Sequence, residues 1–221
     1  MSYYINLSFL SNKHDNPQLS AEARRILSLC EGVMEDDIAK EAGGRLFCPG
    51  RDVDFNISHS GSMTAVSVIR GKNMRTGCDV ELVRPRAKAE EITEEFFSGG
   101  EREYIEAQGE FDLSRFYIIW TLKESYLKLR GLSVFDMAGA PSFISREGSL
   151  AFCAVVSSAL SLNVYELTGG AGEHYILAAA FAGTDVQQPE IRWFSQESLV
   201  CKSIANIKAA PSPAETVSPK I

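Results

Sequence analysis

The segment from Asp52 to Gly71, DVDFNISHSGSMTAVSVIRG, constrains the fold more than any other part of the sequence. Apolar and polar residues alternate in its first half, a Ser-His-Ser-Gly turn follows, and a second apolar run completes it. Successive side chains of a strand point to opposite faces, so the pattern predicts two strands joined by a tight turn. Strand connections of this hairpin type favour an α+β fold.

Two blocks of similar size are predicted along the chain. The first contains the strands YYINLSFLS and MRTGCDVELV and the helix LSAEARRILSLC, which Ser20 can cap. The second begins with the helix LSRFYIIWTLKESYLKLRG, closed by Gly131. It continues with four strand-like runs, SFIS, LAFCAVV, LNVYELT and YILAAAF.

We therefore expect two halves, residues 1–83 and 84–185, and a C-terminal extension over residues 186–221. The extension ends in AAPSPAETVSPKI, whose Pro and Ser content predicts a disordered tail. The charged stretch over residues 84–110 carries short helical patterns broken at Gly99-Gly100, and we expect it to be exposed and partly mobile.

Composition excludes several classes of function. A net charge of -7 argues against general nucleic-acid binding. The five cysteines form no C-x-x-C pair, which favours reduced thiols over a disulfide frame or a zinc site. No apolar run reaches the roughly 18 residues of a membrane span, and the N-terminus lacks a signal-peptide pattern. We expect a cytoplasmic protein without nucleic-acid or membrane partners.

Two carboxylates share one face of the predicted strand GCDVEL. Asp79 and Glu81 alternate with apolar residues, so they point the same way and repel each other. One interpretation is a face exposed to water. The other is a site for a divalent cation such as Mg²⁺, which uses one or two carboxylates and leaves positions for water and phosphate. That second interpretation requires a third anchor and a phosphate site.

The turn FNISHSG is a candidate for the phosphate site, and the helix WTLKESYLKL is a candidate for both the third anchor and the phosphate site. Backbone N–H groups and hydroxyls in the turn can cradle an anion, or its serines can satisfy the hairpin's own backbone. On the helix, Glu124 lies in one arc with Lys123 and Lys128, beside Trp120 and Leu127. This arc fits the wall of a cleft, but a surface ion pair between Glu124 and Lys128 explains the charges equally simply.

Taken together and in this order, three motifs resemble those of the 4'-phosphopantetheinyl transferases of the Sfp type. They are FNISHS at residues 55–60, GCDVE at residues 77–81 and FYIIWTLKESYLK at residues 116–128. The resemblance extends over about residues 19–181. It implies two related α+β halves in pseudo-twofold arrangement, with the active site at their interface. It also implies transfer of the 4'-phosphopantetheine arm of coenzyme A to a serine of an apo acyl or peptidyl carrier protein, releasing adenosine 3',5'-bisphosphate.

The same resemblance implies roles for the acidic residues and one lysine. Asp79, Glu81 and Glu124 correspond to ligands of magnesium. Glu124 is also the candidate for the base that deprotonates the carrier serine. Lys128 would stabilise the charge that develops on the phosphates.

Contacts with coenzyme A follow from the resemblance as well. Lys123 and Lys128 correspond to pyrophosphate contacts, and Ser58 and His59 to contacts with the ribose 3'-phosphate. The family often carries G-K-P before its S-H motif, whereas this chain has GGRLFCPG, so Arg45 is the candidate to replace that lysine.

The carrier needs a docking surface, for which residues 84–110 are the candidate, through the apolar side chains of Ile92, Phe96 and Phe97. A self-packed helical insertion is the alternative. Two other functions remain open, an idle coenzyme A-binding module and a magnesium-dependent phosphohydrolase. One chain contains both halves of the expected cleft, so we expect a monomer.

Overall fold

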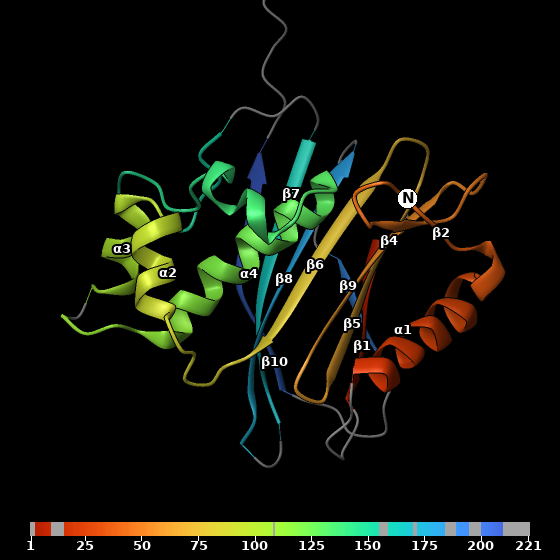
Figure 1. Cartoon of the computed structure of the whole chain (residues 1–221), viewed down its shortest axis with the longest axis horizontal. Helices are drawn as coiled ribbons and strands as arrows, with labels where there is room; N and C mark the ends of the chain where they lie inside the picture. Colours follow the sequence, from red (N-terminus) through yellow and green to blue (C-terminus); the bar gives the residue numbers. More distant parts are fainter. Residues whose placement is uncertain are drawn as a thin grey trace, which may run out of the picture.

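The computed structural model of the chain describes residues 3–9, 16–107, 109–154, 159–169, 172–183, 189–194 and 200–209. Within these residues the chain forms two four-stranded sheets and one two-stranded sheet, with helices on the outside (Figure 1). The predicted α+β class is confirmed. No helix of the described part is long and apolar enough to cross a lipid bilayer.

The first sheet carries the hairpin that opened the sequence analysis. Its strands in spatial order are β4 (Val53–Ser60), β5 (Met63–Arg70), β1 (Tyr3–Phe9) and β9 (Glu190–Trp193). Neighbours pair antiparallel except β1 and β9, which are parallel. Helix α1 (Asn16–Glu31) covers one face, and its Ala23, Ile26 and Leu27 are buried there. Because α1 begins at Asn16, Ser20 lies inside the helix, and the predicted cap was wrong.

The second sheet is antiparallel throughout. Its strands in spatial order are β10 (Val200–Ala209), β7 (Ala159–Thr168), β8 (His174–Gly183) and β6 (Arg75–Leu82). Helix α4 (Leu113–Arg130) lies across this sheet (Figure 1). Asp112 caps its start, and Gly131, at φ 72°, ends it in the left-handed conformation. The predicted helix and its glycine stop are confirmed.

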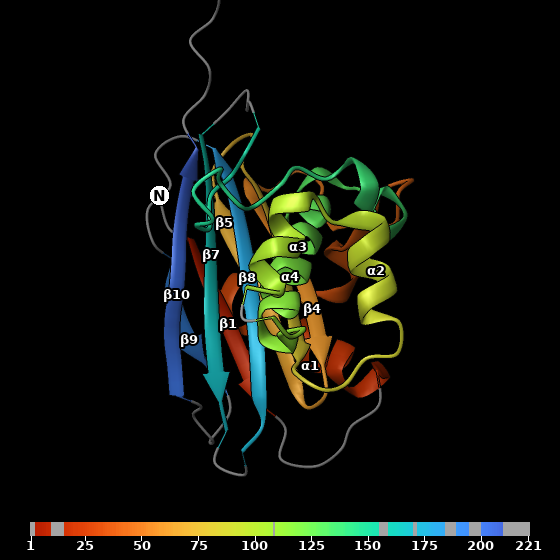
Figure 2. The same cartoon turned by 90° about the vertical axis from the view of Figure 1, so that its left-hand side faces the viewer.

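Short elements complete the described structure. They are η1 (Glu35–Asp37), β2 (Ala39–Lys40), β3 (Leu46–Phe47), α2 (Ala89–Phe96), α3 (Gly99–Ile105) and η2 (Val134–Gly139). Helices α2 and α3 lie on the side of α4 away from the first sheet (Figures 1 and 2). Ser98 caps α3 and forms a capping box with Glu101, so the predicted break lies before Gly99-Gly100 rather than at them.

Helices α2 and α3 pack against the core of the second sheet. Phe97 is 4% exposed, and Ile92 and Phe96 are partly buried against the same core. The expected exposure is therefore wrong for Phe97, whereas Ile92 and Phe96 stay partly exposed, and docking of the carrier on residues 84–110 stays a prediction.

The strand predictions succeed for long strands and fail elsewhere. The run SFIS contributes an isolated bridge between Ile144 and Leu150, and residues 151–154 of LAFCAVV form no strand. Strands β9 and β10 of the extension were not predicted. Residues 210–221, expected to be a disordered tail, lie outside the described residues.

The two sheets do not follow the order of the chain, because each contains a strand from outside the expected half. Strand β6 belongs to the second sheet although it precedes residue 83, and β9 belongs to the first sheet although it comes from the C-terminal extension. The boundaries at residues 83 and 185 and a pseudo-twofold relation of two halves stay predictions.

Strands β4 and β6 are joined by side chains rather than by a backbone ladder. Alternate polar side chains of β4 accept hydrogen bonds from alternate N–H groups of β6. The donors are the N–H groups of Thr76, Cys78, Val80 and Leu82, and the acceptors are the side-chain oxygens of Asp54, Asn56, Ser58 and Ser60, at 2.7, 2.9, 3.3 and 3.1 Å. This side-chain ladder satisfies the free edge of β6 and connects the two sheets.

The backbones of β6 and α4 touch at Gly77. A Cβ atom there would overlap the Ser125 carbonyl oxygen and the Leu129 nitrogen. The glycine of the GCDVE motif is therefore required by close approach of the helix to the strand.

We expect Gly77→Ala to lower the free energy of unfolding by about 3 kcal/mol or more, because two backbones must separate to admit the methyl group. Urea denaturation measures this change. Gly99→Ala is the matched control, since no atom lies within 4 Å of its added Cβ and its φ is not positive. Equal effects of the two substitutions would contradict the close approach.

Candidate active site

The candidate site lies where β4, β6 and the second half of α4 meet. Cys78 and Val80 of β6 enter the apolar core between the sheets, so Asp79 and Glu81 face the opposite side, toward α4. Asp79 is only 4% exposed. A face simply open to water, one of the two interpretations of this strand, does not describe Asp79.

Asp79 is held by one side chain from β4 and one from α4. Its Oδ1 accepts hydrogen bonds from Lys128 Nζ of α4 at 2.7 Å and from Ser58 Oγ of β4 at 3.0 Å. Lys128 Nζ also donates to Ser58 Oγ at 3.3 Å. Burial alone would lower the pKa of Lys128, but the adjacent Asp79 carboxylate outweighs it, so the pKa is raised and the lysine stays charged.

Glu81 contacts one hydroxyl and one cationic side chain, which differ from those that contact Asp79. Ser60 Oγ donates to it at 2.8 Å, and a nitrogen of Arg86 lies 3.9 Å from its other oxygen. The guanidinium of Arg86 stacks over Trp120, 4.1 Å from the ring centroid. Burial, and next the charge of Asp79, raise the pKa of Glu81.

Glu124 completes what we call the acidic cluster, Asp79, Glu81 and Glu124. Burial raises the pKa of Glu124 from 4.5 to about 7, and the charges of Asp79 and Glu81 add to the shift while Lys128 opposes it. The structure thus brings three carboxylates from β6 and α4 into one electrostatic environment.

The carboxylates of the acidic cluster are not arranged as a complete metal-binding site. Among the described residues, no three Asp, Glu, His or Cys side chains are arranged closely enough to hold an ion. Yet Asp79 Oδ2 is buried and has no hydrogen-bond partner in the described structure, although buried carboxylate oxygens normally find one. The surplus of negative charge and this unpartnered oxygen fit residues that accept a hard cation.

Lys123 does not join the acidic cluster. It is 1% exposed, and its Nζ lies 3.1 Å from Glu101 Oε2 in a buried ion pair. Burial lowers its pKa, and Glu101 opposes that effect. Trp120 and Leu127 are buried in the apolar core as well, so they do not form the predicted cleft wall, although Lys128 of the same arc lines a cavity.

The S-H-S-G segment differs from the predicted anion-binding turn. Residues 58–60 stay in β4, and the turn consists of Gly61 and Ser62. Ser58 is 7% exposed and already bonded to Asp79 and Lys128. His59 alternates with Ser58, so it lies on the other face of β4, the face that carries Ile57.

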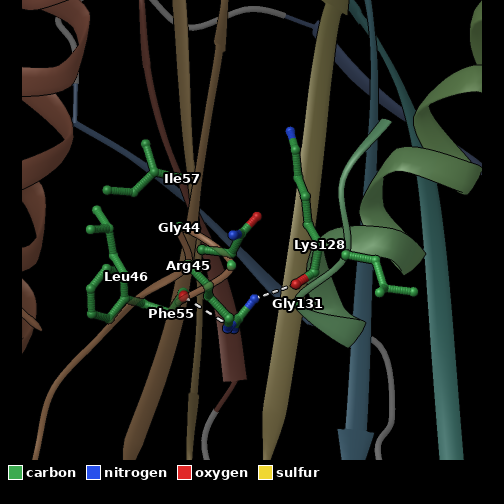
Figure 3. A pocket seen from close by; sticks show the side chains of 10 residues that line it. Gly44, Arg45, Leu46, Phe55, Ile57, Lys128 and Gly131 are labelled. Atoms are coloured by element: carbon green, nitrogen blue, oxygen red, sulfur yellow. Dashed lines mark hydrogen bonds between the residues drawn. The ribbon is translucent and has the colours of Figure 1, made fainter. Parts of the chain in front are cut away.

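Arg45 is an internal clamp. Its guanidinium donates to Asp54 Oδ2 at 2.5 Å, to the Thr76 carbonyl at 2.8 Å, and to the carbonyls of Phe55 and Lys128 (Figure 3). Burial lowers the pKa of Arg45 and raises that of Asp54, while each partner's charge counteracts the other's shift. The side chain is 7% exposed, so it ties the loop after β2 to β4, β6 and the end of α4.

A cavity of about 300 Å³ opens beside this clamp (Figure 3). We call it the β4–α4 cavity. Its lining includes Gly43, Gly44, Leu46, Ile57, Lys128 and Leu132. Lys128 is the residue that this cavity and the acidic cluster share, since it lines the first and bonds to Asp79 in the second.

Comparison with known proteins agrees with these motifs. A sequence profile of the 4'-phosphopantetheinyl transferase superfamily matches residues 75–180, which span β6 and most of the second sheet. The 4'-phosphopantetheinyl transferase AcpT of Salmonella typhi is 30% identical over 140 residues, covering 63% of this chain and 72% of that protein. The chain belongs to the 4'-phosphopantetheinyl transferase superfamily.

Two further relatives carry the same family name. AcpT of Escherichia coli is 30% identical over 140 residues, covering 63% of this chain and 71% of that protein. The 4'-phosphopantetheinyl transferase psf-1 of Bacillus pumilus is 33% identical over 93 residues, covering 42% of this chain and 37% of that protein.

Three residues around the site of this transferase were not predicted. Ser60 could have been found, because it continues the polar face of β4 that Ser58 shares. Arg86 lies five residues after Glu81 in an irregular segment, so no periodicity indicates that it stacks on Trp120. Glu101 is separated from its partner Lys123 by a whole helix–loop unit, and no local pattern joins them.

We expect Asp54→Asn to lower the free energy of unfolding by about 3–5 kcal/mol, because it leaves the buried Arg45 charge without its counter-ion. Chemical denaturation tests this. The control is Glu35→Gln, which removes an exposed partner of Arg24 at 3.6 Å and should cost less than about 1 kcal/mol. A small, equal cost for both would mean that Arg45 is not an internal clamp.

Stability should also depend on the protonation of Glu124. The folded protein holds this proton up to about pH 7, whereas the unfolded chain releases it near pH 4.5. The folded state therefore binds more protons between these values, and the free energy of unfolding falls as the pH rises through this window.

Glu124→Gln mimics the protonated side chain, so we expect it to stabilise the metal-free transferase at pH 8 by about 1–3 kcal/mol, with the difference vanishing below pH 4.5. Urea denaturation in the presence of a chelator measures both. Glu95→Gln on the exposed side of α2 should change little at either pH. A variant no more stable than the wild type at pH 8 would contradict the raised pKa.

Proposed function

We propose that this chain is a magnesium-dependent enzyme that transfers the 4'-phosphopantetheine arm of coenzyme A to a serine of an apo acyl or peptidyl carrier protein. The other product is adenosine 3',5'-bisphosphate. Family membership supports the class of reaction. The observation that carries the assignment of the site is the acidic cluster beside Lys128, which also lines the β4–α4 cavity.

The acidic cluster would hold the metal. Asp79, Glu81 and Glu124 offer carboxylate oxygens, the ligands that Mg²⁺ prefers, and Asp79 Oδ2 is unpartnered among the described residues. A bound magnesium ion supplies positive charge to the diphosphate of coenzyme A.

Lys128 would act on the phosphates. Its charge is secured by Asp79, and its side chain lies between the acidic cluster and the cavity. In the reaction the carrier serine Oγ forms a bond to the β-phosphorus, and the bond to the bridging oxygen of the adenosine bisphosphate breaks. Negative charge accumulates on the oxygens around this phosphorus, where a fixed ammonium group stabilises it.

Glu124 would receive the serine proton. Burial raises the pKa of the metal-free Glu124 to about 7, and a bound magnesium ion would lower it, so the carboxylate would be charged and able to accept a proton. Ser58 and Ser60 aim the other two carboxylates through their hydrogen bonds.

The β4–α4 cavity would receive the nucleotide end of coenzyme A. Arg45 shapes it from inside, because its guanidinium is committed to internal hydrogen bonds. His59 lies on the same face of β4 as Ile57, a lining residue, so we retain it as the candidate for the ribose 3'-phosphate. One chain supplies all these groups, and we propose a cytoplasmic monomer.

Incubation with coenzyme A, Mg²⁺ and a panel of apo carrier proteins tests the function, with mass spectrometry of the carrier as readout. We expect the wild type to add the phosphopantetheine mass to at least one carrier and Asp79→Asn to lower the rate by about 1000-fold, because a phosphoryl-transfer site depends on its metal ligands. Cleavage of coenzyme A without a carrier would indicate a phosphohydrolase, and binding without either reaction an idle module.

The role of His59 is tested with coenzyme A and dephospho-coenzyme A in binding calorimetry. We expect His59→Ala to weaken coenzyme A by about tenfold through loss of one charge-assisted hydrogen bond, and to leave dephospho-coenzyme A nearly unchanged. His174→Ala, which removes a surface partner of Glu166, is the control for loss of an imidazole. Equal weakening of both cofactors would remove the 3'-phosphate role.

A further inference from the structure

The ion pair of Lys123 and Glu101 is buried more completely than the acidic cluster beside it. The side chains are 2% and 0% exposed, and the ammonium nitrogen lies 3.1 Å from the carboxylate. The Pro141 carbonyl accepts from Lys123 Nζ at 3.3 Å, and the Phe97 ring lies 5.4 Å away. Nothing in this enclosed pair is open to a substrate phosphate.

Glu101 uses both of its oxygens to join separate segments. One oxygen accepts from the Ser98 N–H at 2.8 Å and pairs with Lys123, and the other accepts from the Phe143 N–H at 2.9 Å. The start of α3 and the segment after η2 are thereby attached to one point on α4. Removing either partner of this buried ion pair would leave the other charge without its partner.

The point of attachment on α4 is Lys123, and the next residue along the helix is Glu124. Neighbouring residues of a helix point about 100° apart. Fixing Lys123 toward Glu101 therefore fixes the direction in which Glu124 leaves the helix, toward β6. On the β6 side, Gly77 lets the backbone of α4 approach until it touches the strand. The helix is held from two sides, by a backbone contact and by a buried ion pair.

We infer that Lys123 and Glu101 are positioning residues, which orient Glu124 in the acidic cluster by fixing the rotation of α4, and that Lys123 does not contact the pyrophosphate. This inference rests on the proposed function, because Glu124 is assigned there to the metal and the serine proton. It also makes the α3 segment part of the catalytic framework rather than a separate insertion.

Four variants test the inference: Lys123→Met, Glu101→Gln, the double variant Lys123→Met/Glu101→Leu, and Lys202→Met as control. Lys202 is exposed and lies 4.0 Å from Glu166 in a surface pair on the second sheet. The measurements are thermal stability, the Kd for coenzyme A by calorimetry, and kcat for transfer to the carrier.

We expect both single variants to lower kcat by about 10- to 100-fold, as misplacement of a catalytic group does, with the Kd for coenzyme A within about twofold of the wild type. The double variant should regain stability, because an apolar pair can replace a buried ion pair, but not kcat. A large rise in Kd for Lys123→Met with a normal Glu101→Gln enzyme would overturn the inference in favour of a phosphate contact. Normal kcat in the double variant would also overturn the inference, because the ion pair would then contribute to stability alone.

A second readout does not require transfer activity. Trp120 lies one turn of α4 before Glu124, and replacing Trp193, the other tryptophan of the chain, by Phe isolates its emission. We expect the emission of Trp120 to change in the single and double variants and to stay unchanged in Lys202→Met. Unaltered emission in all variants would overturn the positioning role. A wild-type protein that modifies no carrier would instead overturn the proposed function and leave this measurement valid.

Discussion

The side-chain ladder between β4 and β6 is the interaction on which the rest of the structure depends. A sheet edge leaves N–H groups that need partners, and β6 is such an edge. The polar face of β4 supplies them through Asp54, Asn56, Ser58 and Ser60. The two sheets are thus connected through side chains without forming one continuous sheet. One face of β6 packs against α4.

The same hydroxyls that join the sheets also aim the carboxylates. Ser58 accepts from the Val80 N–H and donates to Asp79, and Ser60 does the same between the Leu82 N–H and Glu81. A hydroxyl has one donor and two acceptor positions, so one side chain can serve both contacts. Asp79 and Glu81 are therefore fixed by the packing of the sheets, and burial together with the charge of Asp79 raises the pKa values of Glu81 and Glu124.

Elements with strong periodicity could be predicted from sequence, and contacts between elements could not. Alternation in GCDVEL places Asp79 and Glu81 together, and Gly131 ends α4, as the sequence indicates. Strand β9 alternates but has only four residues, and β10 carries polar residues on both faces, so neither gives a clear strand pattern in the sequence. The burial of Phe97 depends on α4 packing over it, which no local pattern encodes.

The two lysines of α4 show most clearly where local reasoning stops. Lys123 and Lys128 are about 140° apart on the helix and look equivalent in sequence. Each finds a carboxylate from a different layer, Lys123 from α3 and Lys128 from β6. Since Lys128 is engaged by Asp79, the surface pair with Glu124 that the spacing suggested is not formed. Both lysines thus pair with carboxylates of other layers, and Glu124 is left without an ion pair on α4. Burial, and next the charge of Asp79, raise its pKa, and the charge of Lys128 offsets this only in part.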